Sequence, residues 1–283
     1  MNEALTAADA LLIERVEGEN LAAQVEALAD GGALPDALCL RIENAVAAVT
    51  HAKFGRKLNH VVGFGLGAPF DSDHLTMIEA LYEKRGIAVE IDLCPFAETP
   101  TFDLLKQRGY AVNAFSNTYI HTGLGSCRGG PQNSSIQLRD LRPAEAEDFV
   151  AWSVSGFASQ PTHRPMELLR LLAVSALRRS DTRLLVAELD GRVAGTAAIS
   201  IMRIGGTVAA HLFLASTLPE FRKRGVQSAL LQARLDEARR AGAALATVTA
   251  RPTNSSARNT LRAGFRLAYT KATFSRQPAA AVG

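Results

Sequence analysis

The sequence reads TLPEFRKRGVQSALL at residues 217–231, and this stretch predicts more about the fold than any other. An apolar strand pattern ends here, a basic loop follows, and an amphipathic helix pattern begins directly after it. Backbone N–H groups at a helix start lack internal partners, and together with the helix dipole they attract anions. Gly225 lets an anion approach the backbone, while Arg222, Lys223 and Arg224 add positive charge. The stretch therefore predicts a phosphate-binding turn, with a solvated basic turn as the alternative.

Outward from this turn, the C-terminal half alternates between strand and helix patterns. The expected strands are 135–141, 184–188, 193–202, 207–217, 244–250 and 266–274, and the expected helices are 143–158, 166–179, 226–240 and 254–263. The order β-α-α-β-β-β-α-β-α-β fits one mixed sheet covered by helices, with a parallel crossover through the helix at 226–240. We therefore expect an α/β protein with an α+β type of mixed sheet.

The N-terminal half ends in a similar order of elements. The N-terminal half ends with Gly86, a strand at 88–93, Pro95, a helix at 101–107, Gly109-Tyr110 and a strand to 120. The C-terminal half ends in the same order, with Gly242, a strand, Pro252, a helix, Gly264-Phe265 and a strand. The spacings indicate a weak internal repeat with a period of about 155 residues. Before it we expect a helix within the first thirty residues, a strand at 59–67 and a helix capped by Ser72.

A glycine-rich run at 123–131 separates the two halves and is typical of a linker. We therefore expect an N-terminal domain at 1–125, a linker at 126–134 and a C-terminal domain at 135–283.

The composition argues against several classes of protein. Hydrophobic residues make up 47% and charged residues 21%, as in globular proteins. The net charge of +3, without interleaved aromatic and basic residues, does not indicate a nucleic-acid partner. Cys39, Cys94 and Cys127 form no CxxC pair, so we expect neither a disulfide framework nor a metal site. Without a signal-like or membrane-spanning stretch, we expect a cytoplasmic protein with no membrane partner, and the sequence leaves a homo-oligomer open.

Two motifs make the C-terminal half similar to the GNAT superfamily of acyl-CoA N-acyltransferases. The acyl-CoA loop of that family, Arg/Gln-x-x-Gly-x-Gly/Ala after Val-x-Pro-Glu-Tyr/Phe, resembles 217–227, although Gln227 replaces the last small residue. The later motif, Asn-x-x-Ala, a helix and Gly-Phe, resembles 254–265. The resemblance covers 135–276 and implies the GNAT fold. Because the N-terminal half shares the layout but carries carboxylates and no Arg or Lys at 65–73, a tandem fold with a degenerate GNAT-like first half is expected.

The resemblance implies an N-acetyltransferase that moves an acetyl group from acetyl-CoA to a primary amine by direct attack, with a small-molecule acceptor expected. A backbone N–H at the end of the strand 207–217 would stabilise the oxyanion. The implied cofactor contacts are Ala215, Ser216, Thr217, Arg222, Lys223, Arg224, Gly225, Val226, Gln227, Ser228, Asn254, Ser256 and Asn259. For Asn254, Ser256 and Asn259, helix capping or a solvated helix face is the alternative. A non-catalytic acyl-CoA-binding or regulatory module is the alternative function.

The chemistry needs a neutral amine and hence a base. His211 lies on the strand that leads into the loop and titrates near neutral pH, which suits this role; a histidine packed in the sheet is the alternative, and Glu188 is a weaker candidate. Many members of the family protonate the leaving thiolate with a Tyr, but the matching positions here are Thr260-Leu261. Tyr269 is therefore the candidate acid, with a partly buried aromatic residue as the alternative.

A dinucleotide site is the rival hypothesis for the N-terminal half. Gly63-Phe-Gly65-Leu-Gly67 follows an expected strand, and acidic residues lie further along the chain. The spacing is GxGxG where the dinucleotide fingerprint needs GxGxxG, and Pro69 and Phe70 crowd the turn. The sequence therefore favours acetyl-CoA over NAD as the cofactor.

Overall fold

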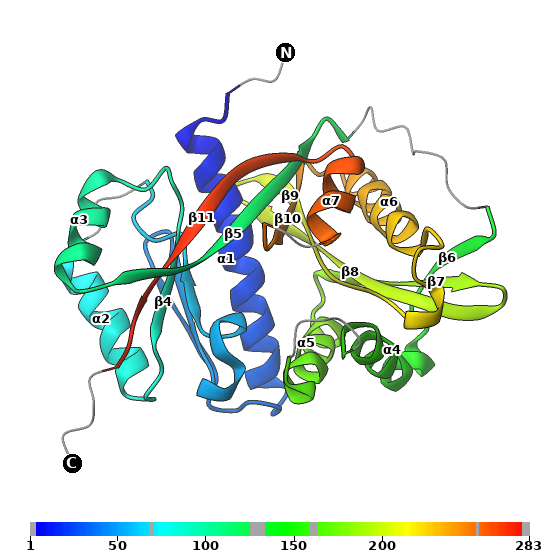
Figure 1. The fold of residues 1–283 in the computed structure, drawn as a ribbon, viewed down its shortest axis with the longest axis horizontal. Coiled ribbons are helices and arrows are strands. Elements are labelled where there is room, and N and C mark those ends of the chain that lie inside the picture. The colour runs from blue at the N-terminus through cyan, green and yellow to red at the C-terminus, as the bar shows by residue number, and fades with distance from the viewer. Residues whose placement is uncertain (1–3, 68–70, 125–133, 159–163, 253–254, 279–283) are drawn as a thin grey trace. The chain divides into compact units, whose positions relative to one another are not determined.

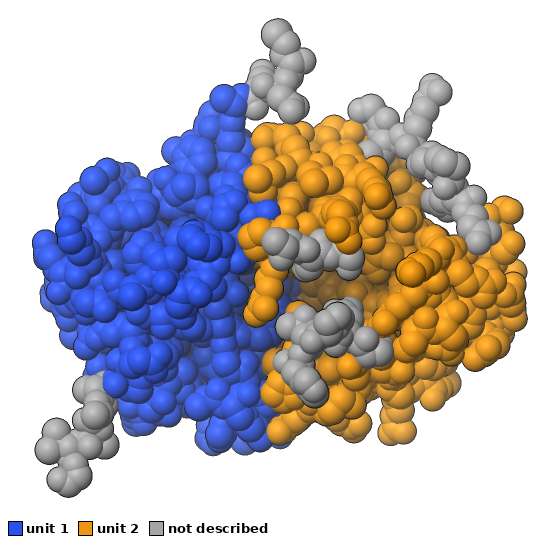
Figure 2. Space-filling view, in the orientation of Figure 1, with its two compact units in different colours: residues 1–118, 268–283 blue, residues 119–267 orange. Residues whose placement is uncertain are grey.

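The computed structural model describes residues 4–67, 71–124, 134–158, 164–252 and 255–278 (Figure 1). The chain divides into two compact units, and each is described here by itself. Unit 1 comprises Met1–Thr118 and Ala268–Gly283, and unit 2 comprises Tyr119–Leu267 (Figure 2). Hydrogen-bonded strands follow the order β1-β2-β3-β4-β11-β5-β10-β9-β8-β7-β6 in a mixed sheet. The expected α/β class is confirmed.

Unit 2 has the predicted order of elements. Its strands are β6 (Ile136–Asp140), β7 (Thr182–Leu189), β8 (Arg192–Ile204), β9 (Thr207–Thr217) and β10 (Leu245–Ala250), and its helices are α4 (Ala146–Ala158), α5 (Met166–Arg178), α6 (Val226–Arg240) and α7 (Ser255–Arg262). A 3₁₀ turn at Pro143–Glu145 precedes α4, and another at Pro219–Phe221 follows β9. Most observed ends lie close to the predicted ones, and those of β9 and α6 coincide with them.

The two faces of the sheet at β9 are covered by different kinds of side chain. Ala210 and Leu212 pack with leucines of α6 in one apolar cluster. Because side chains alternate along a strand, His211 and Phe213 face the other side, where Arg179 at the end of α5 lies 5.2 Å above the Phe213 ring. The α6 side is thus closed by apolar packing, at about 1.5–3 kcal/mol for each fully buried leucine, and the α5 side carries polar groups.

Unit 1 contains elements that the sequence patterns missed. It holds α1 (Ala7–Asp30), β1 (Leu38–Ile42), β2 (Ala45–Val49), the 3₁₀ helix Ala52–Lys57, β3 (His60–Val62), α2 (Ser72–Glu83), β4 (Val89–Leu93), α3 (Thr99–Gln107) and most of β5 (Ala111–Thr122). Neither β1 nor β2 was predicted. All of β2, AVAAV, is buried, so it shows no alternation of apolar and polar residues.

Two further details of unit 1 differ from the expectation. The strand expected at 59–67 ends at Val62, because Gly63, Gly65 and Gly67 have φ values of 79°, 71° and 69°. These left-handed conformations are incompatible with a strand. The N-cap of α2 is Asp71, one residue before the expected Ser72.

The last strand, β11 (Arg266–Arg276), differs from the expected organisation. From Ala268 onward its residues cluster with unit 1, although 135–283 was expected to form one domain. β11 pairs antiparallel with β4, with Ala272 opposite Leu93, whereas β5, whose final residues belong to unit 2, is the neighbour of β10. In the sheet order, β11 therefore follows β4, and β5 stands between β11 and β10. The expected domain ends stay a prediction, and the expected linker, except for residue 134, lies outside the described residues.

A buried ion cluster explains why β11 pairs within unit 1. The Lys271 ammonium is fully buried and lies 3.2 Å from a carboxylate oxygen of Glu14 and 2.8 Å from one of Glu17. The Tyr269 hydroxyl donates to Glu14 at 2.8 Å. Burial raises the pKa of the Glu14 carboxyl to about 7. Burial alone would lower the pKa of Lys271, but the two carboxylates outweigh it and hold that pKa above its ordinary value. Separating these groups would leave buried charges without partners.

We predict that Lys271→Met strongly destabilises the protein. Removing one partner of a buried ion cluster leaves uncompensated carboxylates, which costs about 3–5 kcal/mol. Urea unfolding of the variant should show this loss, while Lys106→Met, at an exposed position of α3, should unfold like the wild type. Equal stability of both variants would contradict the importance of the cluster.

Candidate active site

The candidate site lies in unit 2, at the point where β9 leaves β10. The two strands pair in parallel with Ala209 opposite Leu245 and His211 opposite Thr247. Beyond this rung, β9 continues to Thr217 and β10 to Ala250 with no further paired register among the described residues. The divergence leaves an edge of β9 that an extended, amide-containing ligand could join by main-chain hydrogen bonds.

A β-bulge in β9 accompanies this divergence. Opposite Thr196 and Ala198 of β8 stand Ser216 and Phe213 of β9, so β9 contains an extra residue. Leu214, inside the bulge, has φ 48°, which is rare for a bulky side chain. Bulges bend a strand, increase its twist and redirect its backbone groups. The backbone N–H and C=O groups at the end of β9 therefore point in other directions than those of a regular strand would.

The helix α6 begins close behind, with an N-terminus that no side chain caps. Its N-cap, Gly225, is left-handed with φ 90°, and the first turn contains no acidic residue. Lys223 is also left-handed, with φ 61°. Successive N–H groups in such a turn form an anion-binding concavity, which the helix dipole reinforces. The geometry agrees with the phosphate-binding turn expected from the sequence.

The matching helix of unit 1 is closed to an anion. The Asp71 carboxylate accepts hydrogen bonds from the first backbone N–H groups of α2, at 3.0 and 2.9 Å. A Cβ on Gly63 would lie 2.2 Å from the carbonyl oxygen of Asn44, and one on Gly65 would lie 2.3 Å from Thr101 Oγ1. These glycines therefore allow the chain to pack closely on itself, which gives no support to a dinucleotide site.

The basic side chains of the loop are exposed and weakly engaged. Arg222 donates to the carbonyl of Gly156 at 3.3 Å, and Arg224 pairs with Asp190 at 2.8 Å. Exposed pairs of this kind contribute at most about 1 kcal/mol. A phosphate could therefore replace such partners at little cost.

The predicted cofactor residues on β9 differ in their surroundings. The Thr217 Oγ1 is buried and has no hydrogen-bond partner among the described residues. The Ser216 hydroxyl pairs with that of Thr196 at 3.2 Å, and Ala215 packs against an apolar cluster. A bound ligand could satisfy the Thr217 hydroxyl, whereas Ser216 can contribute through its backbone.

The remaining predicted contacts lie on α6 and α7. Val226 is buried in the apolar cluster beneath α6, so its part in the site is its backbone N–H. Gln227 is half-buried and Ser228 exposed in the first turn. On α7, Ser256 and Asn259 are half-buried, and Asn254 lies outside the described residues.

His211 is held at the last paired rung of β9 and β10. Its Nδ1 lies 2.8 Å from Thr247 Oγ1, and that hydroxyl donates to the carbonyl of Ala210 at 3.3 Å. A hydroxyl has one proton, and its donation to Ala210 favours a ring that carries hydrogen on Nδ1 and the lone pair on Nε2. The ring is buried and stacks on Phe213 with a centroid distance of 6.1 Å. These contacts favour the tautomer that a base acting through Nε2 requires.

The other two candidates for proton transfer have different partners. Tyr269 lies in the part of β11 that belongs to unit 1, where its hydroxyl donates to Glu14. Burial raises the pKa of this phenol far above its ordinary value. Glu188 lies 2.7 Å from the Arg139 guanidinium. Both side chains are thus held by other residues of the chain, and we propose no proton transfer through either of them.

Two glycines that the sequence analysis did not select pack against the bulged end of β9. A Cβ on Gly156 of α4 would lie 2.5 Å from Ser216 Oγ, and one on Gly195 of β8 would lie 2.6 Å from the Ser216 carbonyl oxygen. Only glycine allows α4 and β8 to approach this closely. A glycine inside each predicted element was the signal available in the sequence.

A cluster of possible metal ligands in unit 1 was also not foreseen. Glu17, His60 and Asp92 place ligand atoms within 4.8 Å of one another. Lys271 already pairs with Glu17, and the Arg56 guanidinium pairs with Asp92. Burial raises the pKa of Asp92, but Arg56, His60 and Lys271 together outweigh this effect and lower the pKa to about 2. A divalent ion would have to displace the buried Lys271 and the half-buried Arg56, so we assign no metal there.

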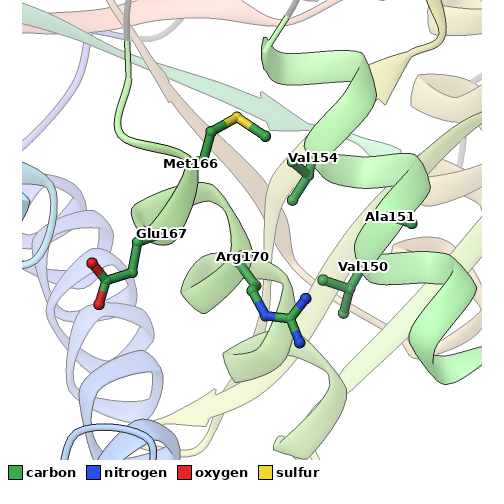
Figure 3. Close-up of a pocket in the computed structure, with 6 residues that line it drawn as sticks. All are labelled: Val150, Ala151, Val154, Met166, Glu167 and Arg170. Atoms are coloured by element: carbon green, nitrogen blue, oxygen red, sulfur yellow. The ribbon is translucent and has the colours of Figure 1, made fainter.

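A shallow pocket of about 280 Å³ lies between α4 and α5 (Figure 3). Its lining consists of Val150, Ala151, Val154, Met166, Glu167 and Arg170. Figure 3 shows the Met166 side chain reaching toward Val154. None of the predicted site residues lines this pocket, and we place no chemical step there.

Comparisons with known proteins agree with this geometry. Residues 141–265 match the sequence model of the acetyltransferase (GNAT) family. The whole chain is similar in fold to a GCN5-related N-acetyltransferase from Kribbella flavida (TM-score 0.62, 17% identity, covering 94% of this chain and 96% of that one). A tandem GNAT protein from the clavulanic acid biosynthesis pathway gives a TM-score of 0.60 at 13% identity and 98% coverage of both chains. No curated protein sequence matches the chain.

Residues 141–265 therefore form a domain of the GNAT acetyltransferase family, which confirms the resemblance drawn from the loop and Gly-Phe motifs. The chain as a whole has the fold of proteins that include a tandem GNAT protein. Family and fold support an acyl-CoA N-acyltransferase in general terms. No helix among the described residues is both long and apolar enough to cross a membrane.

We predict that the bond to Thr247 determines the tautomer of His211. At pH 8, ¹⁵N NMR should show the His211 ring protonated at Nδ1, because Thr247 can only accept there. Thr247→Val should remove this preference, and Thr247→Ser, which keeps the hydroxyl, should preserve it. An Nε2-protonated ring in the wild type would contradict this assignment.

Proposed function

We propose that the protein is an N-acetyltransferase that moves the acetyl group of acetyl-CoA to a primary amine of a small-molecule acceptor by direct attack. The observation that carries the proposal is the divergence of β9 from β10, which stands beside the uncapped N-terminus of α6. The free edge of β9 can form hydrogen bonds with the amides of the pantetheine arm of CoA, and the N-terminus of α6 can bind its pyrophosphate. Membership of residues 141–265 in the GNAT family supports the pairing of the two.

In this proposal the pyrophosphate binds to the loop 222–228. The N–H groups of Gly225, Val226 and Gln227 donate to its oxygens, and Arg222, Lys223 and Arg224 supply positive charge. Gln227 and Ser228 lie in the first turn of α6, and their side chains donate further hydrogen bonds to the pyrophosphate.

The pantetheine arm then runs along the edge of β9. Its amides pair with the backbone at Ala215, Ser216 and Thr217, and one of them satisfies the buried Thr217 hydroxyl. Ser256 and Asn259 contact it from α7, and Asn254 is a further contact expected from the motif. The thioester comes to lie near the bulge, two or three residues from His211.

Acyl transfer proceeds through a tetrahedral intermediate. The amine nitrogen attacks the thioester carbon while His211 accepts its proton at Nε2, and the carbonyl electrons move to oxygen. A backbone N–H at the bulged end of β9 donates to this oxyanion. When the carbonyl re-forms, the C–S bond breaks and its electron pair leaves with sulfur as the CoA thiolate.

The alternative function is an acyl-CoA-binding or regulatory module without turnover. The half-buried Gln227, where the family pattern has a small residue, favours this alternative because it narrows the loop. Release of free thiol in the presence of amines distinguishes the two functions.

We predict that acetyl-CoA binds to unit 2 through the loop. Calorimetric titration should show binding to the wild type, and Gly225→Asp or Arg222→Ala should weaken it at least about tenfold, equivalent to ~1.4 kcal/mol. The aspartate adds a negative charge and strains a left-handed position with φ 90°. The matched control is Gly206→Asp, at another left-handed glycine with open space around it. Undiminished binding by the Gly225 variant, or binding of NAD in place of acetyl-CoA, would move the site elsewhere.

We predict that His211→Asn lowers kcat/KM for thiol release by about 10²–10⁴-fold across a panel of primary amines, the range expected for a general base. The Kd for acetyl-CoA should stay within about threefold of the wild type. The control is His51→Asn, at an exposed position of unit 1. Full activity of the His211 variant would eliminate the base role, and acetyl-CoA binding without turnover of any amine would favour the regulatory module.

A further inference from the structure

Arg234 is a buried cation in the middle of α6. The residue is 3% exposed and donates to two backbone carbonyls: Nε donates to Leu230 at 3.1 Å and Nη1 to Phe213 at 3.4 Å. Among the described residues it has no carboxylate within ion-pair distance. Burial lowers the pKa of this guanidinium to about 9. Even so, the group is a cation at neutral pH.

The nearby charged groups do not neutralise it. Glu237, one turn further along α6, pairs with Arg183 and lies 2.7 Å from Arg240. On the opposite face of the sheet, His211 pairs with Thr247, and the Arg179 guanidinium pairs with Asp181 at 2.8 Å. The positive charge of Arg234 therefore stays locally uncompensated.

The position of Arg234 would ordinarily hold an apolar side chain. Leu230 and Leu231, four and three residues before it respectively, pack in two separate apolar clusters against the sheet. Arg234 lies between these two rows on the same buried face of the helix. An unpaired buried charge is costly, so its retention in such a place suggests that a bound group supplies the compensating negative charge.

The contact with Phe213 places Arg234 at the divergence of β9 from β10. Phe213 is two residues beyond His211, the last paired residue, and is next to the bulged Leu214. Arg234 is also nine residues beyond Gly225, which is about 13 Å along the helix axis. The guanidinium is thus far from the anion site at the helix start. It lies instead beside the part of β9 that the thioester would reach.

We propose that Arg234 is a further catalytic residue, whose guanidinium stabilises the negative charge that the acyl-CoA sulfur acquires as the thiolate leaves. This inference rests on the proposed function. When the C–S bond of the tetrahedral intermediate breaks, the electron pair goes to sulfur and the carbonyl re-forms. The amine proton has gone to His211, and Arg234 remains protonated throughout. The two faces of the sheet then divide the work: His211 takes the proton from the amine, and Arg234 stabilises the leaving group.

The decisive experiment titrates the thiol of CoA bound to the protein, following the ultraviolet absorbance of the thiolate. A nearby buried cation favours the thiolate, so the pKa of the bound thiol should lie about one unit or more below that of free CoA. In Arg234→Met this lowering should disappear. Arg239→Met, at an exposed position near the end of α6, is the matched control and should behave like the wild type. With acetyl-CoA and a reactive amine, kcat of Arg234→Met should fall at least about tenfold, with the acetyl-CoA Kd within about threefold.

The outcomes separate this inference from the proposed function. No binding of CoA to the wild type would overturn the proposed function. Binding with an ordinary thiol pKa in the wild type, or with a lowered pKa that survives Arg234→Met, would overturn the role of Arg234 and leave the CoA site intact. Thermal unfolding supplies a further check: replacing an unpaired buried charge should not lower Tm. If Arg234→Met does not fold, Arg234→Gln serves the same purpose, and the wild-type titration alone can still refute the inference.

Discussion

The bulge at Leu214 is the constraint on which the candidate site depends. One extra residue in β9 shifts the register with β8 between Thr196 and Ala198, and pairing with β10 ends at His211. The bulged strand must pass close to its neighbours, which is why Gly156 and Gly195 stand where any Cβ would clash with Ser216. The same path delivers the chain to the basic loop and to the start of α6. The proposed ligand edge and the position of His211 thus both lie beside one irregularity in one strand.

In unit 1 a similar strand–turn–helix has, among the described residues, no open anion site at the start of its helix. Its β3 leads through a glycine turn into α2, as β9 leads through a basic loop into α6. There the glycines pack against Asn44 and Thr101, and Asp71 occupies the helix N–H groups that would otherwise face an anion. Polar chemistry in unit 1 is concentrated instead in the buried cluster around Lys271, Glu14 and Glu17. In unit 1 the N-terminus of the helix is thus occupied by a side chain of the chain itself.

Local patterns predicted unit 2 well because its elements carry clear periodicity and punctuation. The order of the elements and the bounds of β9 and α6 were predicted from the sequence. In unit 1 the patterns were weaker. The buried run Ala45–Val49 has no alternation, and the glycines after Val62 were mistaken for a continuing strand.

Long-range pairings were beyond local reasoning. The partner of Lys271 is Glu14, at the other end of the chain, so no local pattern could show that β11 belongs with unit 1. Thr247 reaches His211 only through the register of β9 and β10. No local pattern distinguishes Arg234 from the other arginines in helices, and only its burial in the structure does so. The residues assigned to CoA binding remain predictions, drawn from the loop motif and from the surroundings of each side chain.

Hydrogen–deuterium exchange with and without acetyl-CoA tests the central claim most directly. Exchange reports which backbone N–H groups a ligand protects. If acetyl-CoA binds as proposed, it slows exchange at residues 212–217 of β9 and 224–229 of the loop and α6, with no change at 60–67 or 72–76 of unit 1. Protection confined to the glycine turn and α2 of unit 1, or bound acetyl-CoA without protection of β9 and α6, would contradict it.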